Sequence, residues 1–268
     1  MNAIGDRELM VNIVQLEEKL ESSLKLLRQD YSLCAVKAEF EAEGASFRDL
    51  VRLRRLTACQ DSALHLKIGG VEALRDIKDA LELGVDGLIA PMVESPFGVT
   101  KFINAVESVF SGRDIYKSIN IETRTAVLSI DDILSEAKGK IDNITIGRTD
   151  LSNSYFDVKV KPDSKFIFDL ISTVSNKVSS AELTLTIGGS ITIESINRFR
   201  KNRENLENFV SSIETRKVIL PAGIFLKKEH ALEEALRFEE LYLRSKLEHE
   251  KSLSHMDRVR LDKIKSRI

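Results

Sequence analysis

Two acidic residues, Glu122 and Asp150, each follow an apolar run and are the first candidates for chemistry. A buried carboxylate is costly unless it is paired or binds a metal. Oxygen ligands from two neighbouring strand ends, completed by water and substrate, suit Mg²⁺ or Mn²⁺ better than zinc. The sequence therefore allows a magnesium or manganese site. The alternative is two ordinary ion pairs, Glu122 with Arg124 and Asp150 with Arg148.

Lys67 is the only charged residue in the apolar run that ends at Gly69-Gly70. Its ammonium group could hold a carboxylate, or it could form a Schiff base if its pKa were lowered. The alternative is an internal ion pair with Glu39 or Glu41. Alternate residues of a strand share a face, so both glutamates would lie near Lys67. Together with Glu43 they are the candidate general bases.

Two pairs of glycines, Gly69-Gly70 and Gly188-Gly189, follow apolar runs. Glycine lets backbone N–H groups approach an anion closely, so these pairs are candidate substrate contacts. His65 alternates with Lys67 and, if it points inward, is either a possible acid or base or a structural histidine. His230 opens a polar helical segment and is expected at the surface.

Short apolar runs alternate with amphipathic helical stretches along the chain, which favours a parallel sheet with crossover helices. Eight parallel strands in a chain of 268 residues would close into a (β/α)8 TIM barrel, an α/β fold, and an open doubly wound sheet is the main rival. In such barrels the active site lies at the carboxyl ends of the strands, where Glu122 and Asp150 are expected. The predicted strands are 33–40, 64–68, 87–90, 117–122, 143–147, 183–187, 209–213 and 217–220.

The two ends of the chain are predicted to be helical. Apolar residues recur at spacings of three and four from Met10 to Leu27, which indicates an N-terminal helix. The predicted organisation is an N-terminal helix at 1–30, a barrel at 31–226 and a C-terminal helical extension at 227–268. The extension is longer than the outer ring of one barrel needs, so part of it is expected to pack on a neighbouring subunit or to be solvated after about Glu250.

Composition excludes several classes of protein. Forty Lys and Arg nearly balance 42 Asp and Glu, so the overall charge gives no indication of nucleic-acid binding. No segment is apolar and long enough for a signal peptide or a membrane span. Cys34 and Cys59 are too few for a disulfide framework and are expected to be reduced core residues. These features predict a cytoplasmic protein that acts on neither nucleic acid nor membrane.

Three strings of residues lie at the predicted strand ends in a specific order. Gly84 to Glu94 ends in Pro-Met-Val-Glu, Ile121 to Val127 contains Glu-Thr-Arg, and Ile141 to Ser152 ends in Gly-Arg-Thr-Asp-Leu-Ser. In order and interval they resemble the HpcH/HpaI aldolase and citrate lyase β-subunit superfamily. The resemblance extends from about Leu33 to Ser152. Beyond Ser152 only the general alternation of strands and helices of a barrel remains.

The resemblance implies that Glu122 and Asp150 are the ligands of a divalent metal, Mg²⁺ or Mn²⁺. The metal would chelate a 2-oxo acid such as pyruvate or oxaloacetate and stabilise an enolate as a C–C bond breaks or forms. Related enzymes exchange a C-terminal helix between subunits, which implies a homo-oligomer, a trimer or a hexamer. The second substrate, an aldehyde, a sugar or a thioester, is not identified by the sequence.

Three positions depart from the family pattern. Where the family has Gly-Glu-His, the similar stretch of this chain reads Ala38-Glu39-Phe40-Glu41, so the catalytic histidine is missing. Lys67 stands where the family has an arginine that binds the substrate carboxylate, and it lacks the bidentate fork. Arg148 replaces the proline after Gly147 and could hold a second carboxylate, a phosphate or the carboxylate of a sugar acid.

The predicted function is therefore a metal-dependent C–C lyase or aldolase that acts on a 2-oxo acid or a related acyl substrate. One alternative is an enzyme of phosphoenolpyruvate or acyl-CoA chemistry on the same barrel, and another is a catalytically silent, metabolite-binding barrel. The predicted catalytic residues are Lys67, Glu39, Glu41 and Arg148. The predicted substrate-binding residues are Lys67, Gly69, Gly70, Glu94, Arg148, Gly188 and Gly189.

Overall fold

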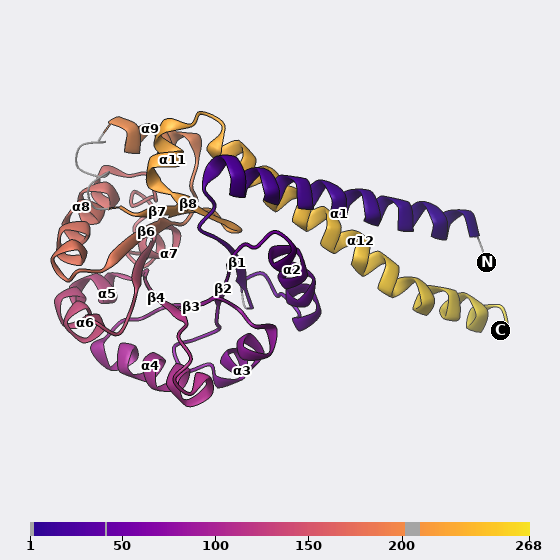
Figure 1. Ribbon diagram of the computed structural model, residues 1–268, viewed down its shortest axis with the longest axis horizontal. Helices are drawn as coiled ribbons and strands as arrows, with labels where there is room; N and C mark the ends of the chain where they lie inside the picture. The colour runs from indigo at the N-terminus through magenta and orange to yellow at the C-terminus, as the bar shows by residue number, and fades with distance from the viewer. Residues whose placement is uncertain (1–2, 41, 202–209) are drawn as a thin grey trace.

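The computed structural model describes residues 3–40, 42–201 and 210–268, with side chains described from residue 12 onward except at 256. Eight strands close into a barrel in sequence order, and helices surround it (Figure 1). The predicted α/β barrel is thus confirmed over the open sheet. The strands are β1 (Ala35–Glu39), β2 (Leu64–Lys67), β3 (Gly87–Ala90), β4 (Tyr116–Ile121), β5 (Asn143–Gly147), β6 (Thr184–Gly188), β7 (Ser212–Glu214) and β8 (Val218–Pro221).

Some of the helices begin at residues whose side chains satisfy free backbone N–H groups. Ser46 caps α2 in a reciprocal capping box with Asp49, and Ser95 caps α4, which has Pro96 at its first position. The helices are α1 (Ala3–Tyr31), α2 (Phe47–Cys59), α3 (Leu74–Leu83), α4 (Pro96–Phe110), α5 (Arg124–Leu128), α6 (Ile130–Ala137), α7 (Arg148–Asn153), α8 (Lys165–Ser180), α9 (Ile193–Lys201), α11 (Ala222–Lys227) and α12 (Ala231–Lys265).

The eighth strand runs in the opposite direction to the prediction. β8 is antiparallel to both of its neighbours, β7 and β1. Only residues 215–217 separate β7 from β8, whereas a parallel connection needs a crossover of about a dozen residues or more. The chain therefore forms a hairpin, in which the Thr215 N–H donates to the Val218 carbonyl at 2.9 Å. The predicted start of β7 at residue 209 lies outside the described residues.

Apolar and polar residues alternate along the strands and separate the two faces of the barrel wall. Leu64, Leu66 and Ile68 on and just after β2 belong to the core cluster under the surrounding helices, as predicted. The alternate residues His65 and Lys67 belong to the other face. The same alternation recurs on β4, β5 and β6, so the apolar core lies between barrel and helices and the barrel interior is largely polar.

Hydrogen bonds join the polar side chains inside the barrel. Asn143 Nδ2 donates to Ser118 Oγ at 2.9 Å and to Thr145 Oγ1 at 3.1 Å. Asn143 Oδ1 accepts from Thr186 Oγ1 at 3.1 Å, and Thr186 Oγ1 lies 2.7 Å from Ser212 Oγ. Buried polar groups that are fully bonded fix one arrangement of the strands, because any slip would leave a group without a partner. The network thus fixes the positions of the polar side chains inside the barrel, beneath the carboxyl ends of the strands.

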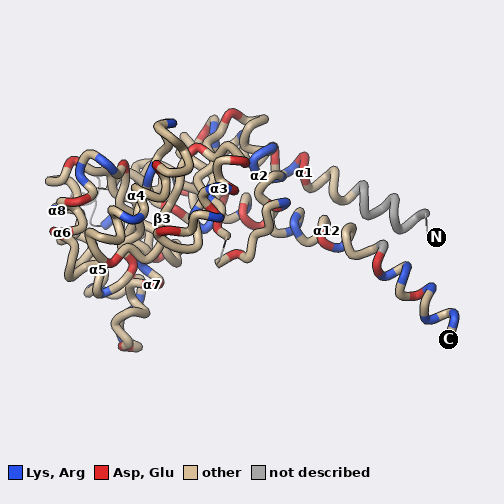
Figure 2. The backbone as a smooth tube through the Cα atoms, turned by 90° about the horizontal axis from the view of Figure 1, so that it is seen from below, with Lys and Arg blue, Asp and Glu red and all other residues tan. Residues whose placement is uncertain are grey.

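The first and last helices leave the barrel together as a two-helix arm (Figure 1). The ring of His249 on α12 lies 2.9 Å from the Glu17 carboxylate on α1. Charged residues are distributed along α12 and along the part of α1 whose side chains are described (Figure 2). Over the described residues, no helix is both long enough and apolar enough to cross a membrane.

Candidate active site at the carboxyl ends of the strands

A cavity of about 450 Å³ opens at the carboxyl ends of the barrel strands. Its wall carries Glu122 and Asp150 together with Lys67 and Glu39, four of the residues predicted from the sequence. The other lining residues are Lys37, Ala42, Asn120, Gly147, Thr149, Gly189, Ser190, Ile191, Glu214, Thr215, Arg216, Leu236 and Glu239. This is the end of the barrel where enzymes of this architecture place their chemistry.

Glu122 follows β4 directly and is almost fully buried, with 2% of its surface exposed. Its Oε1 accepts a hydrogen bond from the Met92 N–H at 2.9 Å, and its Oε2 accepts one from Asn120 Nδ2 at 3.1 Å. Met92 has a φ of +52°, a costly conformation for a residue other than glycine. The backbone after β3 is thus held in an unfavourable shape that directs its N–H at the carboxylate.

Burial raises the pKa of Glu122, and the negative charge of Asp150 raises it further. Lys67 and the two hydrogen bonds act in the other direction, but burial is the largest influence. Gly147 also makes room for Glu122, because a Cβ at position 147 would lie 2.5 Å from Oε2. The carboxylate therefore sits in a tight, poorly solvated place where a further positive charge would stabilise its ionised form.

Asp150 belongs to the first turn of α7, the short helix that follows β5 at once. Its side chain is exposed and lines the same cavity as Glu122. Neither of the alternative ion pairs forms. Arg124 lies over the ring of Tyr155, and Arg148 pairs with Asp163.

Lys67 ends β2, and its Nζ lies 4.0 Å from Oε2 of Glu122. The side chain is 17% exposed and lines the cavity. The alternative partner Glu39 is instead bound by Lys37, at 3.3 Å. Lys67 therefore lies toward Glu122 at the cavity wall, and its carboxylate partner there is Glu122 rather than Glu39. Glu41, which was predicted to lie near it, is outside the described residues.

Lys37, Glu39 and Glu214 form a buried charged cluster on the wall opposite β4. Lys37 and Glu214 were not predicted from the sequence. Lys37 Nζ lies 2.6 Å from Glu214 Oε1 and 3.3 Å from Glu39 Oε1. Burial alone would lower the pKa of Lys37, but attraction by Glu214 and Glu39 outweighs it and raises the pKa. The signal available in the sequence was a lysine two residues before Glu39, on the same strand face.

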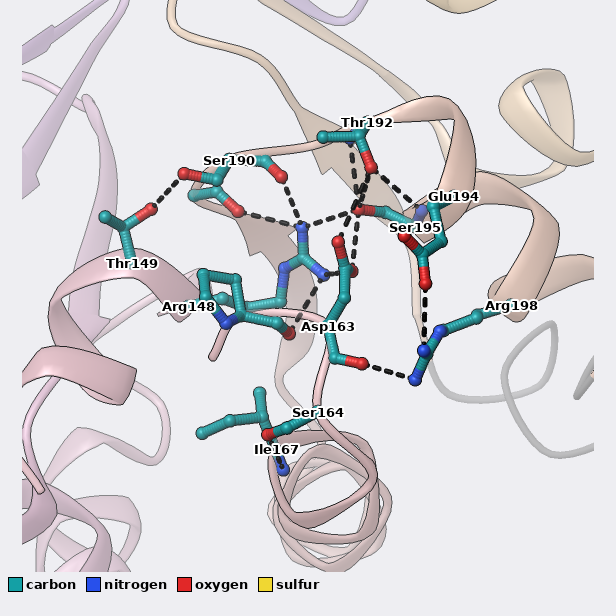
Figure 3. A network of polar contacts seen from close by, with 12 residues as sticks. Arg148, Thr149, Asp163, Ser164, Ile167, Ser190, Thr192, Glu194, Ser195 and Arg198 are labelled. Carbon is teal, nitrogen blue, oxygen red and sulfur yellow. Dashed lines mark hydrogen bonds and ion pairs between the residues drawn. The ribbon is translucent and has the colours of Figure 1, made fainter. Parts of the chain in front are cut away.

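Arg148 does not line the cavity, contrary to the prediction that it binds substrate. Its side chain is fully buried, and its guanidinium donates to the carbonyls of Gly188, Gly189, Ser190 and Pro162, to the Asp163 carboxylate and to Ser195 Oγ, as Figure 3 shows for this network. With its donors engaged by the protein, Arg148 ties the start of α7 to the segment between α7 and α8 and to the loop after β6. Its role is to hold the loop rather than to contact a ligand.

The predicted glycine and Glu94 contacts are mostly not at the cavity. Gly69 and Gly70 do not line it, and the Gly69 N–H donates to Asp76 at 2.7 Å. Glu94 is exposed and accepts from Thr123 Oγ1 at 2.7 Å, which supports the loop beside Glu122. Of these predicted contacts, only Gly189 lines the cavity. Its φ is +83°, and a Cβ at position 189 would lie 2.6 Å from the backbone nitrogen of Thr149, so no side chain fits there.

The histidines and cysteines lie away from the cavity wall. His65 stacks on Tyr116 at the start of β4, with ring centroids 4.6 Å apart, so it lies at the amino end of the barrel. His230 is exposed beside Glu233, as expected. Cys34 and Cys59 are free, as predicted, but both are exposed, so their expected place in the core was wrong. Cys34 lies just before β1, and Cys59 is the last residue of α2.

The wall of the cavity fits a divalent cation in two respects. Five carboxylates line it against three cationic side chains, an excess of two negative charges. Asn120 Oδ1, a ligand type that Mg²⁺ accepts, is buried beside Glu122 without a hydrogen-bond partner. Over the described residues, no group of three or more His, Cys, Asp or Glu is arranged around one point. A cation here would thus use Glu122 and Asp150, with water and substrate completing its shell.

Solved structures with the same fold are found among aldolases and related enzymes. A HpcH/HpaI aldolase/citrate lyase family protein from Burkholderia cenocepacia J2315 is 17% identical, with 85% of this chain and 90% of that chain covered and a TM-score of 0.59. A HpcH/HpaI aldolase from Desulfitobacterium hafniense DCB-2 is 15% identical, with 67% and 75% covered and a TM-score of 0.55. Malate synthase from Haloferax volcanii in its lead(II) complex is also 15% identical, with 71% and 62% covered and a TM-score of 0.55.

These structures establish the shared fold, and a family model adds a match in sequence. No curated protein matches the sequence significantly. The model described as HpcH/HpaI aldolase/citrate lyase matches residues 49–209, which include Lys67, Glu122 and Asp150 and make up more than half of the chain. The chain therefore belongs to the HpcH/HpaI aldolase/citrate lyase family.

Proposed function

We propose that the protein is a carbon–carbon lyase or aldolase that depends on Mg²⁺ or Mn²⁺ and acts on a 2-oxo acid. The observation that carries the proposal is that Glu122 and Asp150, from two successive strand ends, line one cavity with Lys67. The excess of two negative charges on the cavity wall supports a divalent cation. The solved malate synthase with this fold was obtained as a lead(II) complex, which agrees with a divalent cation in such a barrel.

Glu122 and Asp150 would hold the cation, with Asn120 Oδ1 beside them. A divalent cation bound there supplies Lewis-acid stabilisation of the negative charge that develops on the 2-oxo oxygen. Lys67, 4.0 Å from Glu122, is placed to attract the carboxylate of the same substrate. The lysine is a point charge without a guanidinium fork, so it contributes attraction and leaves the orientation of the carboxylate to other contacts.

Glu39 is the candidate to accept the hydroxyl proton when a C–C bond is cleaved. Burial would raise its pKa, but Lys37, Lys67 and Arg216 attract its charged form and hold the pKa below its ordinary value. Glu39 is therefore ionised at neutral pH and able to receive a proton at a carboxylate oxygen. A carboxylate is proposed for this role because the family histidine is missing and no histidine lines the described wall of the cavity.

The test is calorimetry of Mn²⁺ binding with and without pyruvate, in the native chain and in Glu122→Gln and Asp150→Asn. We expect pyruvate-dependent binding that both substitutions abolish. Glu94→Gln is the matched control, because Glu94 lies two residues after Met92 but does not line the cavity. Binding that survives in both variants would refute the site.

Turnover separates the remaining alternatives. Saturation by phosphoenolpyruvate in place of pyruvate would favour phosphoenolpyruvate chemistry on the same barrel. A silent, metabolite-binding barrel would bind pyruvate without cleaving any aldol adduct of it. Measurable cleavage that is lost in Glu122→Gln would exclude the silent barrel.

Two further predictions concern the oligomeric state and the cellular location of the protein. Assembly into a trimer or hexamer and a cytoplasmic location stay predictions. The arm formed by α1 and α12 carries exposed apolar residues, among them Leu243 and Leu247, which supports an assembly. The unidentified second substrate, an aldehyde, a sugar or a thioester, would enter from the open side of the cavity.

A further inference from the structure

The reversed β8 gives the cavity a feature that eight parallel strands would not provide. β7 runs with its carboxyl end toward the cavity, and the chain returns at once through residues 215–217. In place of a loop leading to an outer helix, a tight turn therefore stands at the cavity mouth. Thr215 and Arg216 of this turn both line the cavity.

The turn is anchored on both sides, so its shape is fixed before any ligand arrives. The Val218 N–H donates to Thr215 Oγ1 at 3.1 Å. Lys217 is buried, its ammonium binds the Glu43 carboxylate, and it lies 4.3 Å from the centre of the Tyr242 ring on α12. Lys217 is thus held among α12 and the segment after β1, while the neighbouring Arg216 faces the cavity.

Arg216 is the most exposed of the three cations on the described wall of the cavity. Its side chain is 50% exposed, and its nearest carboxylate oxygen, Glu39 Oε2, is 3.7 Å from Nη1. Within the described part of the chain it donates no hydrogen bond, although a guanidinium has five N–H donors. Glu39 is already bound by Lys37 at 3.3 Å. The fork of Arg216 is therefore available to a ligand, unlike that of the buried Arg148.

Arg216 also lies across the cavity from the two carboxylates. In a closed barrel of eight strands, β4 stands opposite β8, and Glu122 follows β4 while Arg216 precedes β8. A small acid held at Glu122 and Asp150 would extend over the cavity toward the 215–217 turn. A guanidinium at that end suits a planar carboxylate, which it can bind through two parallel hydrogen bonds.

We propose that Arg216 is a specificity-determining residue that binds a second carboxylate at the far end of the substrate, so that the preferred substrates are 2-oxo dicarboxylic acids. This rests on the proposed function, because the near end of the acid must be held at Glu122 and Asp150. The neighbouring Glu39 and Glu239 on the same wall favour a ligand group with one negative charge over a doubly charged phosphate.

The test compares acids of equal length with and without the distal carboxylate: 2-oxoglutarate against 2-oxopentanoate, and 2-oxoadipate against 2-oxohexanoate. Dissociation constants are measured by calorimetry in saturating Mn²⁺. We expect the native chain to bind at least one dicarboxylate on the order of tenfold more tightly than its partner, the size of a charge-assisted contact. Arg216→Gln should remove that preference, and Arg216→Lys should keep part of it.

Arg113→Gln is the control, since it removes the same charge from an exposed residue just before β4, at the amino end of the barrel. Its preference should equal that of the native chain. Equal binding of the paired acids by the native chain, or a preference that persists in Arg216→Gln, would overturn this inference alone. Failure of every one of these acids to bind with Mn²⁺, or binding unaffected by Glu122→Gln, would instead overturn the proposed function and this inference with it.

Discussion

The ammonium of Lys67 and the carboxylate of Glu122 lie 4.0 Å apart although their strands are not neighbours. β2 and β4 are separated by β3 in the barrel, so only the curvature of the closed wall and the inward direction of both side chains bring them together. The pair thus joins a cation to one of the two candidate metal ligands, at the wall of the cavity that Asp150 also lines. Its consequences can be measured without knowing the physiological substrate.

Metal affinity should depend on pH through Glu122. A divalent cation competes with a proton for this carboxylate, and burial raises its pKa from the ordinary 4.5. As pH falls, Mn²⁺ affinity should therefore begin to drop at a higher pH than an exposed glutamate would give. Calorimetric titrations between about pH 5 and 8 measure the dependence, and an affinity that stays constant down to about pH 4.5 would contradict it.

Lys67 should act by charge rather than by a covalent bond. If so, Lys67→Arg should keep most of the activity, whereas Lys67→Met should lose on the order of a hundredfold in kcat/KM. A Schiff-base mechanism predicts instead that both variants are inactive. Borohydride treatment with pyruvate provides a second measurement, because a reduced imine would add mass to Lys67 in the native chain.

Glu214→Gln should destabilise the fold by about 3 kcal/mol, because it leaves the buried ammonium of Lys37 with Glu39 as its only carboxylate partner among the described residues. Urea unfolding measures the change. Asp169→Asn is the control, since it breaks an exposed pair with Lys165 on α8 and should cost less than about 1 kcal/mol. Equal effects of the two substitutions would mean that the buried cluster adds nothing to stability.

Acid should destabilise the protein through His65. Burial lowers the pKa of this histidine from 6.5 to about 4. Between these values the unfolded chain takes up a proton that the folded chain does not, so stability falls as pH drops from 6.5 toward 4. The loss approaches about 3 kcal/mol.

The difference in unfolding free energy between the native chain and His65→Gln, followed over this pH range, isolates the contribution of that residue. The corresponding His230→Gln variant is the control for replacing a histidine at an exposed position. A pH dependence in His65→Gln that equals the native one would refute the assignment.

The arm should carry the contacts of an assembly. Leu243 and Leu247 on α12 are 48% and 55% exposed. Replacing both with Gln should lower the mass measured by light scattering, whereas Leu74→Gln on α3, where the side chain is 41% exposed, should not. Deleting the whole extension would be uninformative, because Phe238 and Ala235 of α12 are buried in the core. A monomer in the native chain would refute the predicted oligomer.

The sequence by itself determined the barrel and the places of its principal acidic residues. Short strands with one apolar face must be covered by helices, and that alternation gave the positions of most strands closely. The seventh prediction, 209–213, shares only residues 212 and 213 with β7. Because strand ends of a barrel meet at one face, Glu122, Asp150, Lys67 and Glu39 could be placed in one cavity before any geometry was known.

Only the tertiary structure decided the direction of β8 and the roles of the arginines. The sequence indicated that the connection at 215–217 is short. The alternation of apolar runs and helical stretches did not show that the chain turns back there and presents Arg216 to the cavity. Arg148 precedes the candidate metal ligand Asp150 by two residues in the sequence. The backbone at the start of α7 nevertheless directs its side chain away from the cavity, toward Asp163 and Gly189. Sequence spacing fixes which strand end a residue follows, whereas the backbone angles of the turn decide where its side chain points.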